Sequence, residues 1–203
     1  MIQRIMLSLM LLLVGTSLSA QHTAREWIAE LNKSLGARYG IHIEVNTEGV
    51  DRLAGYYMVD GDAYYLTLGV MEVYSDAKLR YEINNERKEV TEDMVNLDSV
   101  DLLSNPTRAF QFVEDEFTAT IVEQSSEGAV LRLVPHDDTL GITYISLMLR
   151  RDAGGVIPVS ISYDYDGYVV AIELQRADIE SSELPRWREH KDDYRAYDMV
   201  SFL

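Results

Sequence analysis

Residues 73–90 read VYSDAKLRYEINNERKEV, and this stretch decides the fold. Apolar and polar side chains alternate through Leu79, Tyr81 and Ile83, which is the period of a half-buried β-strand. Asn84-Asn85 then breaks the alternation, and a second run follows it. Two alternating runs separated by turn-forming residues predict a β-hairpin.

The same period of two recurs along most of the chain, on both sides of the hairpin. The further predicted strands are residues 39–45, 53–59, 63–73, 117–123, 129–134, 142–149, 157–163 and 168–174. Dipeptides suited to tight turns separate several of them, namely Asp60-Gly61, Glu127-Gly128, Gly154-Gly155 and Asp166-Gly167. This order indicates antiparallel strands joined by short connections.

Helical spacing replaces the alternation in two regions. Residues 23–36 open with the capping box Thr23-x-x-Glu26, carry apolar residues three or four positions apart and end on a glycine. Residues 91–116 predict two short helices separated by Pro106. The tail after Ile179 is charged and then apolar, which predicts a polar linker leading to a last edge strand.

About ten strands against three helices make the chain mainly β, within the α+β class. A flat open sheet rarely holds so many strands without curling. We therefore expect a strongly curved antiparallel sheet, an incomplete β-barrel, whose concave face is covered by the short helices. Residues 21–203 are expected to form one domain, because no repeat or low-complexity segment interrupts them.

Composition and charge exclude several classes of function. The 203 residues are 47% hydrophobic, which suits a globular domain. Their formal net charge of −16 disfavours binding to nucleic acids and to anionic membrane surfaces, because both attract clustered basic residues. The chain has no cysteine, so disulfides, thiol catalysis, cysteine zinc sites and thiol-linked lipids are excluded.

Residues 1–20, MIQRIMLSLMLLLVGTSLSA, have the form of a cleavable export signal. Arg4 precedes an apolar run that is too short to span a bilayer, and small residues follow this run. Cleavage is expected near Ala20. The mature protein is therefore expected to lie outside the inner membrane.

The sequence contains none of the common motifs for catalysis, such as a nucleophile elbow, a zinc-protease helix or a phosphate loop. The cluster His136-Asp137-Asp138 is explained best as a polar turn. A calcium-loop spacing runs from Ser162 to Glu173, but predicted strands flank it instead of helices, so a hairpin is favoured. We expect no enzyme activity, no metal and no cofactor.

Tyrosine is the commonest aromatic residue, with 13 copies against 4 phenylalanines and 2 tryptophans. Tyrosine is a good strand former, so strand composition is the favoured explanation. The functional alternative is an amphipathic wall for a lipid or a sugar. Exposure of Tyr56 or Tyr64 on the convex face would favour a binding function.

Residues 53–66 read LAGYYMVDGDAYYL, residues 75–78 read SDAK and residues 88–90 read KEV. In this order the segments resemble motifs of the LolA-like outer-membrane lipoprotein carriers. Residues 53–66 (LAGYYMVDGDAYYL) are similar to the family's opening G-x-φ-x-φ-x-G-x-x-φ-x-φ, where φ is apolar. In the hairpin, Ser75-Asp76-Ala77-Lys78 resembles the S-D-G-K turn, with Ala77 in place of glycine, and Lys88-Glu89-Val90 resembles the K-E-V return. Further similarities are residues 103–106 to L-x-N-P, 131–135 to L-x-L-x-P, and 193–200 to the ending D-Y-P-x-x-E-φ-I-D of a Bacteroidetes branch.

This resemblance implies a half-barrel around an apolar cavity that shields lipoprotein acyl chains in the periplasm during transfer to the outer membrane. An inner-membrane release complex and an outer-membrane acceptor are the partners that we expect, and we expect the protein to be a monomer. The candidate cavity residues are Trp27, Leu31, Leu66, Leu68, Leu79, Tyr81, Ile83, Leu97, Leu103, Leu131, Leu133, Ile145 and Leu147.

Two other classes of function stay open at this point. An exported cell-envelope binding protein would use the same fold for a peptide, lipid or glycan ligand. An enzyme would need acidic or histidine side chains that converge in a pocket. The positions of the apolar, tyrosine, acidic and histidine side chains in the folded chain distinguish a carrier, a binding protein and an enzyme.

Overall fold

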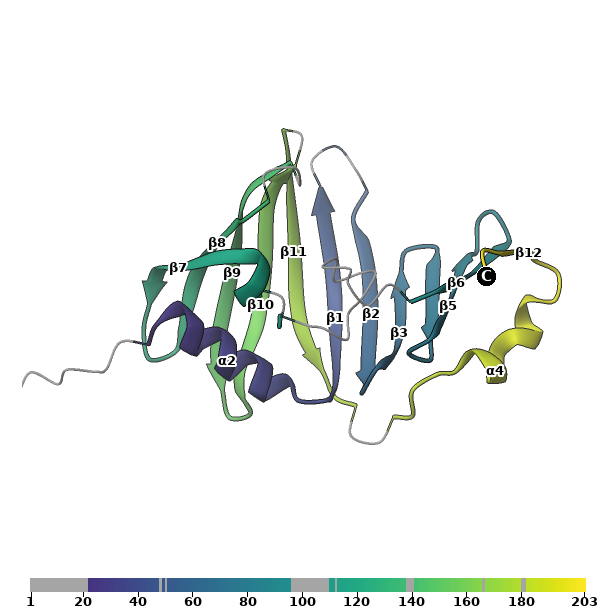
Figure 1. Cartoon of the computed structure of the whole chain (residues 1–203), viewed down its shortest axis with the longest axis horizontal. Coiled ribbons are helices and arrows are strands. Elements are labelled where there is room, and N and C mark those ends of the chain that lie inside the picture. Colours follow the sequence, from purple (N-terminus) through teal and green to yellow (C-terminus); the bar gives the residue numbers. More distant parts are fainter. Residues whose placement is uncertain are drawn as a thin grey trace, which may run out of the picture.

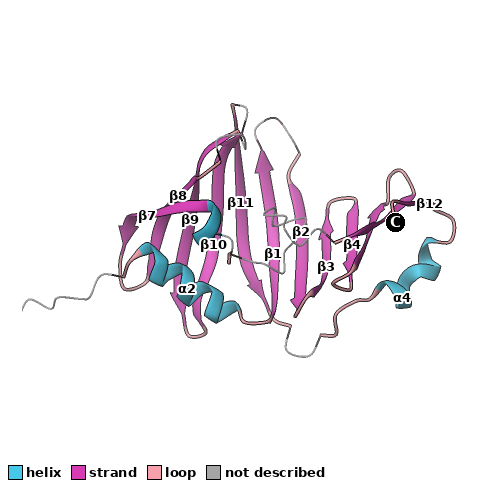
Figure 2. Ribbon diagram, viewed as in Figure 1, coloured by secondary structure: helices cyan, strands magenta, loops and turns pink. Residues whose placement is uncertain are grey.

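One large β-sheet dominates the molecule (Figure 1, Figure 2). The computed structural model describes residues 22–47, 49, 51–95, 110–111, 113–137, 141–165, 167–179 and 182–203. Within these ranges the sheet has twelve strands in the order β12-β6-β5-β4-β3-β2-β1-β11-β10-β9-β8-β7. The two edge strands do not pair with each other, so the sheet is open and the barrel is incomplete.

The strands are β1 (Arg38–Thr47), β2 (Leu53–Asp60), β3 (Ala63–Leu68), β4 (Met71–Ser75), β5 (Leu79–Asn84), β6 (Glu89–Met94), β7 (Phe117–Gln124), β8 (Gly128–Pro135), β9 (Ile142–Asp152), β10 (Gly155–Tyr165), β11 (Tyr168–Ala177) and β12 (Asp198–Ser201). The helical elements are α2 (Ala24–Leu35), α3 (Val113–Glu116), α4 (Trp187–His190) and the 3₁₀ turn η3 (Lys191–Tyr194). The chain is therefore mainly β and its sheet is an open, curved one, as the sequence predicts. No helix among the described residues is long and apolar enough to cross a membrane.

The predicted hairpins are present with few differences. The prediction of a single strand over residues 63–73 is wrong, because β3 ends at Leu68 and β4 begins at Met71, its pairing partner. Gly69 adopts a φ of 58° in the intervening turn, a conformation that suits glycine. The turn escaped prediction because Leu66, Leu68 and Val70 continue the apolar alternation across it.

The expectation of helices from residue 91 onward is wrong at its start. Residues up to Met94 belong to β6, which pairs with β5 along its whole length. Near the other end of this region, α3 is a single helical turn directly before β7. Residues 96–109, with the candidate cavity residues Leu97 and Leu103, lie outside the described residues.

Helix α2 forms as its sequence predicts and packs on one face of the sheet. Glu26 at N3 completes the capping box with Thr23, and Gly36 ends the helix with a φ of 67°. The helix approaches the sheet closely at Gly155, where an added Cβ would clash with the Ser34 side chain. The face that carries α2 is called the helix face below, and the opposite face is called the outer face.

Strand pairing assigns the side chains to these two faces. Tyr57, Leu66 and Val73 are consecutive partners across β2, β3 and β4, and all three belong to the core under α2. Their neighbours Tyr65 and Tyr74 therefore point to the outer face. The larger core lies on the helix face and joins α2 to strands on both halves of the sheet.

A C-terminal segment, residues 182–203, covers the outer face of the half-sheet from β2 to β6, and we call it the strap. Leu184 packs on Met58 and Ala63, and further along Trp187 stacks on Tyr81. The strap ends as β12, which joins the edge of β6 in a parallel pairing (Figure 1). The predicted last edge strand is thus confirmed, whereas α4 and η3 were not predicted.

Candidate functional site

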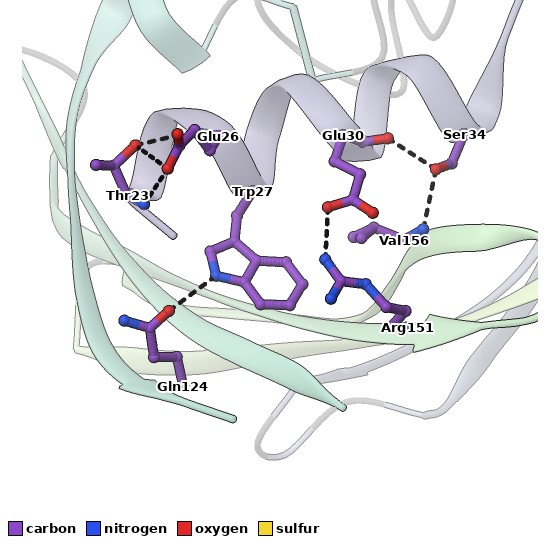
Figure 3. A network of polar contacts seen from close by, with 8 residues as sticks. All are labelled: Thr23, Glu26, Trp27, Glu30, Ser34, Gln124, Arg151 and Val156. Atoms are coloured by element: carbon purple, nitrogen blue, oxygen red, sulfur yellow. Dashed lines mark hydrogen bonds and ion pairs between the residues drawn. The ribbon is translucent and has the colours of Figure 1, made fainter. Parts of the chain in front are cut away.

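Polar contacts fix α2 over the helix face (Figure 3), at the end of the sheet where β1 begins (Figure 1). The Trp27 indole nitrogen donates to Gln124 Oε1 at 3.2 Å, and the Arg151 guanidinium lies 4.7 Å from the Trp27 ring centre. Arg151 also pairs with Glu30 on the next turn of the helix. One aromatic side chain thus connects the helix to β7 and β9.

The C-terminal half of α2 is attached to β10. The Ser34 hydroxyl donates to the Glu30 carbonyl at 2.7 Å and accepts from the Val156 amide at 2.9 Å (Figure 3). This close approach requires the glycine at position 155. The helix therefore closes the helix face at this end, and its buried residues Trp27 and Leu31 are fully inaccessible to solvent.

Toward the opposite end of the strands, the helix face carries a row of apolar side chains that are incompletely buried. Seven neighbouring strands contribute one residue each: Ile145, Tyr163, Ile172, Val45, Leu53, Leu68 and Met71, from β9, β10, β11, β1, β2, β3 and β4 respectively. Cross-strand pairs such as Ile145 with Tyr163, Val45 with Leu53, and Leu68 with Met71 hold them together. We call this row the apolar band.

Burial changes steeply along the strands from α2 to the apolar band. Leu131 and Leu147 beneath the helix are fully buried, whereas Leu53 in the band is 38% exposed. Tyr168, on the same face at the start of β11, is 56% exposed. Apolar side chains that continue a core and remain partly accessible are a surface on which an apolar ligand gains contact area.

The structure divides the candidate cavity residues into groups. Six of them are buried core residues of the helix face: Trp27, Leu31, Leu66, Leu131, Leu133 and Leu147. Leu68 and Ile145 are half-buried and belong to the apolar band. Contact of these eight residues with a ligand stays a prediction.

Three candidates lie on the wrong face for a common cavity with the others. Tyr74 pairs with Tyr81 on the outer face, so Leu79, Tyr81 and Ile83 all point away from α2. Ile83 is buried there, in a cluster with Tyr74 and Val90 that the strap covers. The expectation that these three residues share one cavity with the other candidates is therefore wrong, because alternation groups them on one face without showing which face it is.

Sequence reasoning did not select several residues of the apolar band, namely Val45, Leu53, Met71, Tyr163 and Ile172. All of them except Met71 fall in strands that were predicted with nearly correct bounds. The sequence does not show the register between neighbouring strands. In the structure Val45 pairs with both Leu53 and Ile172, and this register brings the three side chains together.

The outer face beneath the strap carries a network of aromatic and polar side chains. One Glu72 carboxylate oxygen accepts from the hydroxyls of Tyr65, at 3.1 Å, and Tyr194, at 3.1 Å. Asn85 donates to the other oxygen at 2.8 Å and accepts from Tyr197 of the strap at 3.0 Å. The strap is therefore held by hydrogen bonds as well as by ring stacking.

Burial raises the pKa of tyrosines on β4 and β5 that lie beneath the strap. It raises the pKa of Tyr81 to about 12, with a further contribution from its hydrogen bond to Glu92. Burial raises the pKa of Tyr74 still more, and the hydrogen bond with Tyr194 adds to the shift. These tyrosines pack the strap against the sheet.

Tyr64 is fully buried and Tyr56 half-buried, so the exposed tyrosine wall that would favour a binding function is not formed by this pair.

The other candidate sites are ordinary hairpin features. Asp164 accepts from the Gly167 amide at 3.2 Å in the turn between β10 and β11, which are antiparallel strands and not the flanking helices of a calcium loop. His136 follows β8 and contacts the Asp115 carbonyl at 2.9 Å. In the described ranges no group of three or more histidine, aspartate or glutamate side chains could hold a metal ion.

Comparison with known proteins shows similarity in structure alone. Neither a protein-family model nor a curated protein matches the sequence. An uncharacterised conserved protein from Thermus thermophilus aligns with a TM-score of 0.53 at 9% identity, over 88% of this chain and 98% of that chain. LprF from Mycobacterium bovis aligns with a TM-score of 0.45 at 11% identity over 80% and 96% of the two chains.

A LolA-superfamily protein from Nitrosomonas europaea aligns with a TM-score of 0.37 at 8% identity over 81% of this chain and 96% of that chain. The likeness to the Thermus thermophilus protein shows a shared fold. An open curved sheet with a helix on one face is also the fold that the resemblance to LolA-like carriers implied. Membership of a Bacteroidetes branch stays a prediction.

Proposed function

We propose that this chain is a carrier for acyl chains, which it holds on the apolar band of the helix face. The single observation that carries the proposal is the band itself, a row of partly exposed apolar side chains from seven neighbouring strands. An acyl chain gains about 0.8 kcal/mol for each CH₂ group that it buries. A band of this width therefore supports binding without a cofactor or a covalent bond.

The more specific proposal is a periplasmic carrier of lipoproteins bound for the outer membrane. It is supported by the export-signal pattern of residues 1–20 and by the motifs that resemble LolA-like carriers. The net charge of −16 supports donor and acceptor proteins as partners, because an acidic protein does not adsorb to anionic lipid surfaces. We propose that the carrier works as a monomer.

Fluorescence titration with cis-parinaric acid tests the proposal on purified mature protein. Two variants on β9 form a matched pair: Ile145→Asp places a charge in the apolar band, and Met148→Asp places one on the outer face, where Met148 is 43% exposed. We expect Ile145→Asp to weaken binding by about tenfold or more, because a carboxylate resists transfer into an apolar contact. Met148→Asp should bind like the native protein.

Leu68→Ser repeats this test on β3 with a smaller polar side chain, in case Ile145→Asp lowers the stability of the fold. Circular dichroism and thermal unfolding compare the folding of each variant with that of the native chain. Absence of fatty-acid binding to the native protein would contradict the proposal. Equal weakening by the Ile145 and Met148 variants would contradict the assignment to the helix face.

A further inference from the structure

A cavity of about 380 Å³ lies on the other side of the sheet, between the strap and the turn from β4 to β5. Its lining comes from two parts of the chain that are far apart in sequence, residues 74–81 and residues 186–188. Ligand pockets of proteins have volumes of about 300 to 1,000 Å³, so the cavity suits a small molecule. It is separate from the apolar band, which lies on the helix face.

The apolar part of the cavity wall is a set of stacked aromatic rings. Tyr81 and Trp187 are nearly parallel, with an interplanar angle of 13° and ring centres 4.6 Å apart. Trp187 also stacks on Tyr194, and Tyr74 beside them is buried. Because each ring is held by its neighbours, the wall keeps its shape and binding costs little side-chain entropy.

Ser75 also borders the cavity, but strand alternation turns its side chain to the helix face, where its pairing partner Tyr64 belongs to the core. Ser75 is the one buried polar residue in the part of the chain that the structure describes. The Ala77 amide donates to its oxygen over 3.4 Å within the turn from β4 to β5.

Arg186 and Arg188 of the strap complete the lining. Arg188 pairs with Glu189 and its side chain is 79% exposed, so a ligand anion in the cavity is expected to meet Arg186. The nearby Asp76 carboxylate accepts from the Lys78 and Leu79 amides at 3.1 and 3.0 Å, so it already has partners within its own turn. Guanidinium groups bind carboxylates in a planar, two-pronged geometry.

We propose that this cavity binds a small carboxylate with a flat apolar body. The apolar body lies beside the rings of Tyr81 and Trp187, and the carboxylate meets Arg186. The ligand then contacts both the sheet and the strap. Binding therefore stabilises the strap on the outer face, because a ligand that binds only while the strap covers this face shifts the equilibrium toward the covered state.

Calorimetric titration of the full-length mature protein with naphthalene-2-carboxylate tests this proposal. Naphthalene-2-carboxamide, which has the same shape without the charge, is the matched ligand control. We expect the carboxylate to bind and the carboxamide to bind about tenfold more weakly, since the charged hydrogen bonds to arginine are lost. Near-ultraviolet circular dichroism verifies that the stacked rings of the strap remain in place.

Arg186→Gln should weaken carboxylate binding by about tenfold, while Arg150→Gln, an exposed arginine outside this cavity, should leave it unchanged. Arg186 makes no side-chain capping hydrogen bond to α4, so its replacement is not expected to unfold the strap. Equal affinity for the two naphthalene compounds would overturn the proposal. Unchanged affinity in Arg186→Gln, or absence of binding to the native chain, would overturn it as well.

Discussion

At the scale of single residues, the turn from β4 to β5 contains a strained alanine. Ala77 has a φ of 79°, in the left-handed region that costs an L-residue about 1 to 2 kcal/mol and costs glycine little. The LolA-like motif that this turn resembles has glycine at the same place. The departure of this sequence from that motif therefore has a physical consequence in the folded chain.

We predict that Ala77→Gly raises the free energy of unfolding by about 1 kcal/mol, because it removes this strain. Urea denaturation followed by circular dichroism measures the change. Ala196→Gly is the control, since Ala196 is exposed and is not among the described residues with positive φ. The control should be neutral or destabilising, and a loss of stability in Ala77→Gly would contradict the assigned backbone strain.

The residues of the candidate site show how far a sequence pattern reaches. Alternation correctly groups Leu79, Tyr81 and Ile83 on one face, and Leu131 with Leu133 on one face. It does not show that these two groups lie on opposite faces, because that depends on the register of every strand between them. The sequence could therefore predict that the site consists of apolar strand faces, but it could not predict which residues lie together on one face of the sheet.

At the scale of elements, the best prediction was α2, whose capping box, apolar spacing and terminal glycine all lie within a short stretch. The least successful was the strap. Its charged residues suggested a linker, whereas Trp187 and Tyr194 bind it to the outer face through rings on β4 and β5. These contacts join residues more than a hundred positions apart, so no local pattern indicates them.

We predict that the strap loosens at high pH. The pKa of Tyr81 is raised from 10.0 to about 12, so the protonated phenol favours the folded state. This contribution is complete below pH 10 and is lost as the pH rises through about 12. The raised pKa values of Tyr74 and Tyr194, both caused mainly by burial, add in the same direction.

Absorbance of tyrosinate and fluorescence of tryptophan, both recorded against pH, measure this effect. Tyr144 and Tyr168 are exposed and do not contact the strap. The variants Tyr144→Phe and Tyr168→Phe are therefore the controls. The late-titrating fraction should persist in these variants and decrease in Tyr81→Phe. Ionisation of every tyrosine in a single step near pH 10 would contradict the burial of the network.

At the scale of the whole molecule, the sheet presents two different surfaces. The helix face is closed by α2 at one end and presents the apolar band toward the other. The outer face of the half-sheet from β2 to β6 is covered by the strap. The sequence predicted an open, curved and mainly β fold, since this follows from the number and period of the strands.

We predict that an acyl chain binds on the helix face. Isotope-filtered nuclear Overhauser spectroscopy tests it most directly, using unlabelled fatty acid and protein labelled at the methyl groups of isoleucine, leucine, valine and methionine. We predict cross-peaks from the acyl chain to Leu68, Ile145 and Ile172 of the apolar band. Cross-peaks to outer-face methyl groups such as Met148 and Val134, or none to the band under saturating fatty acid, would contradict the account.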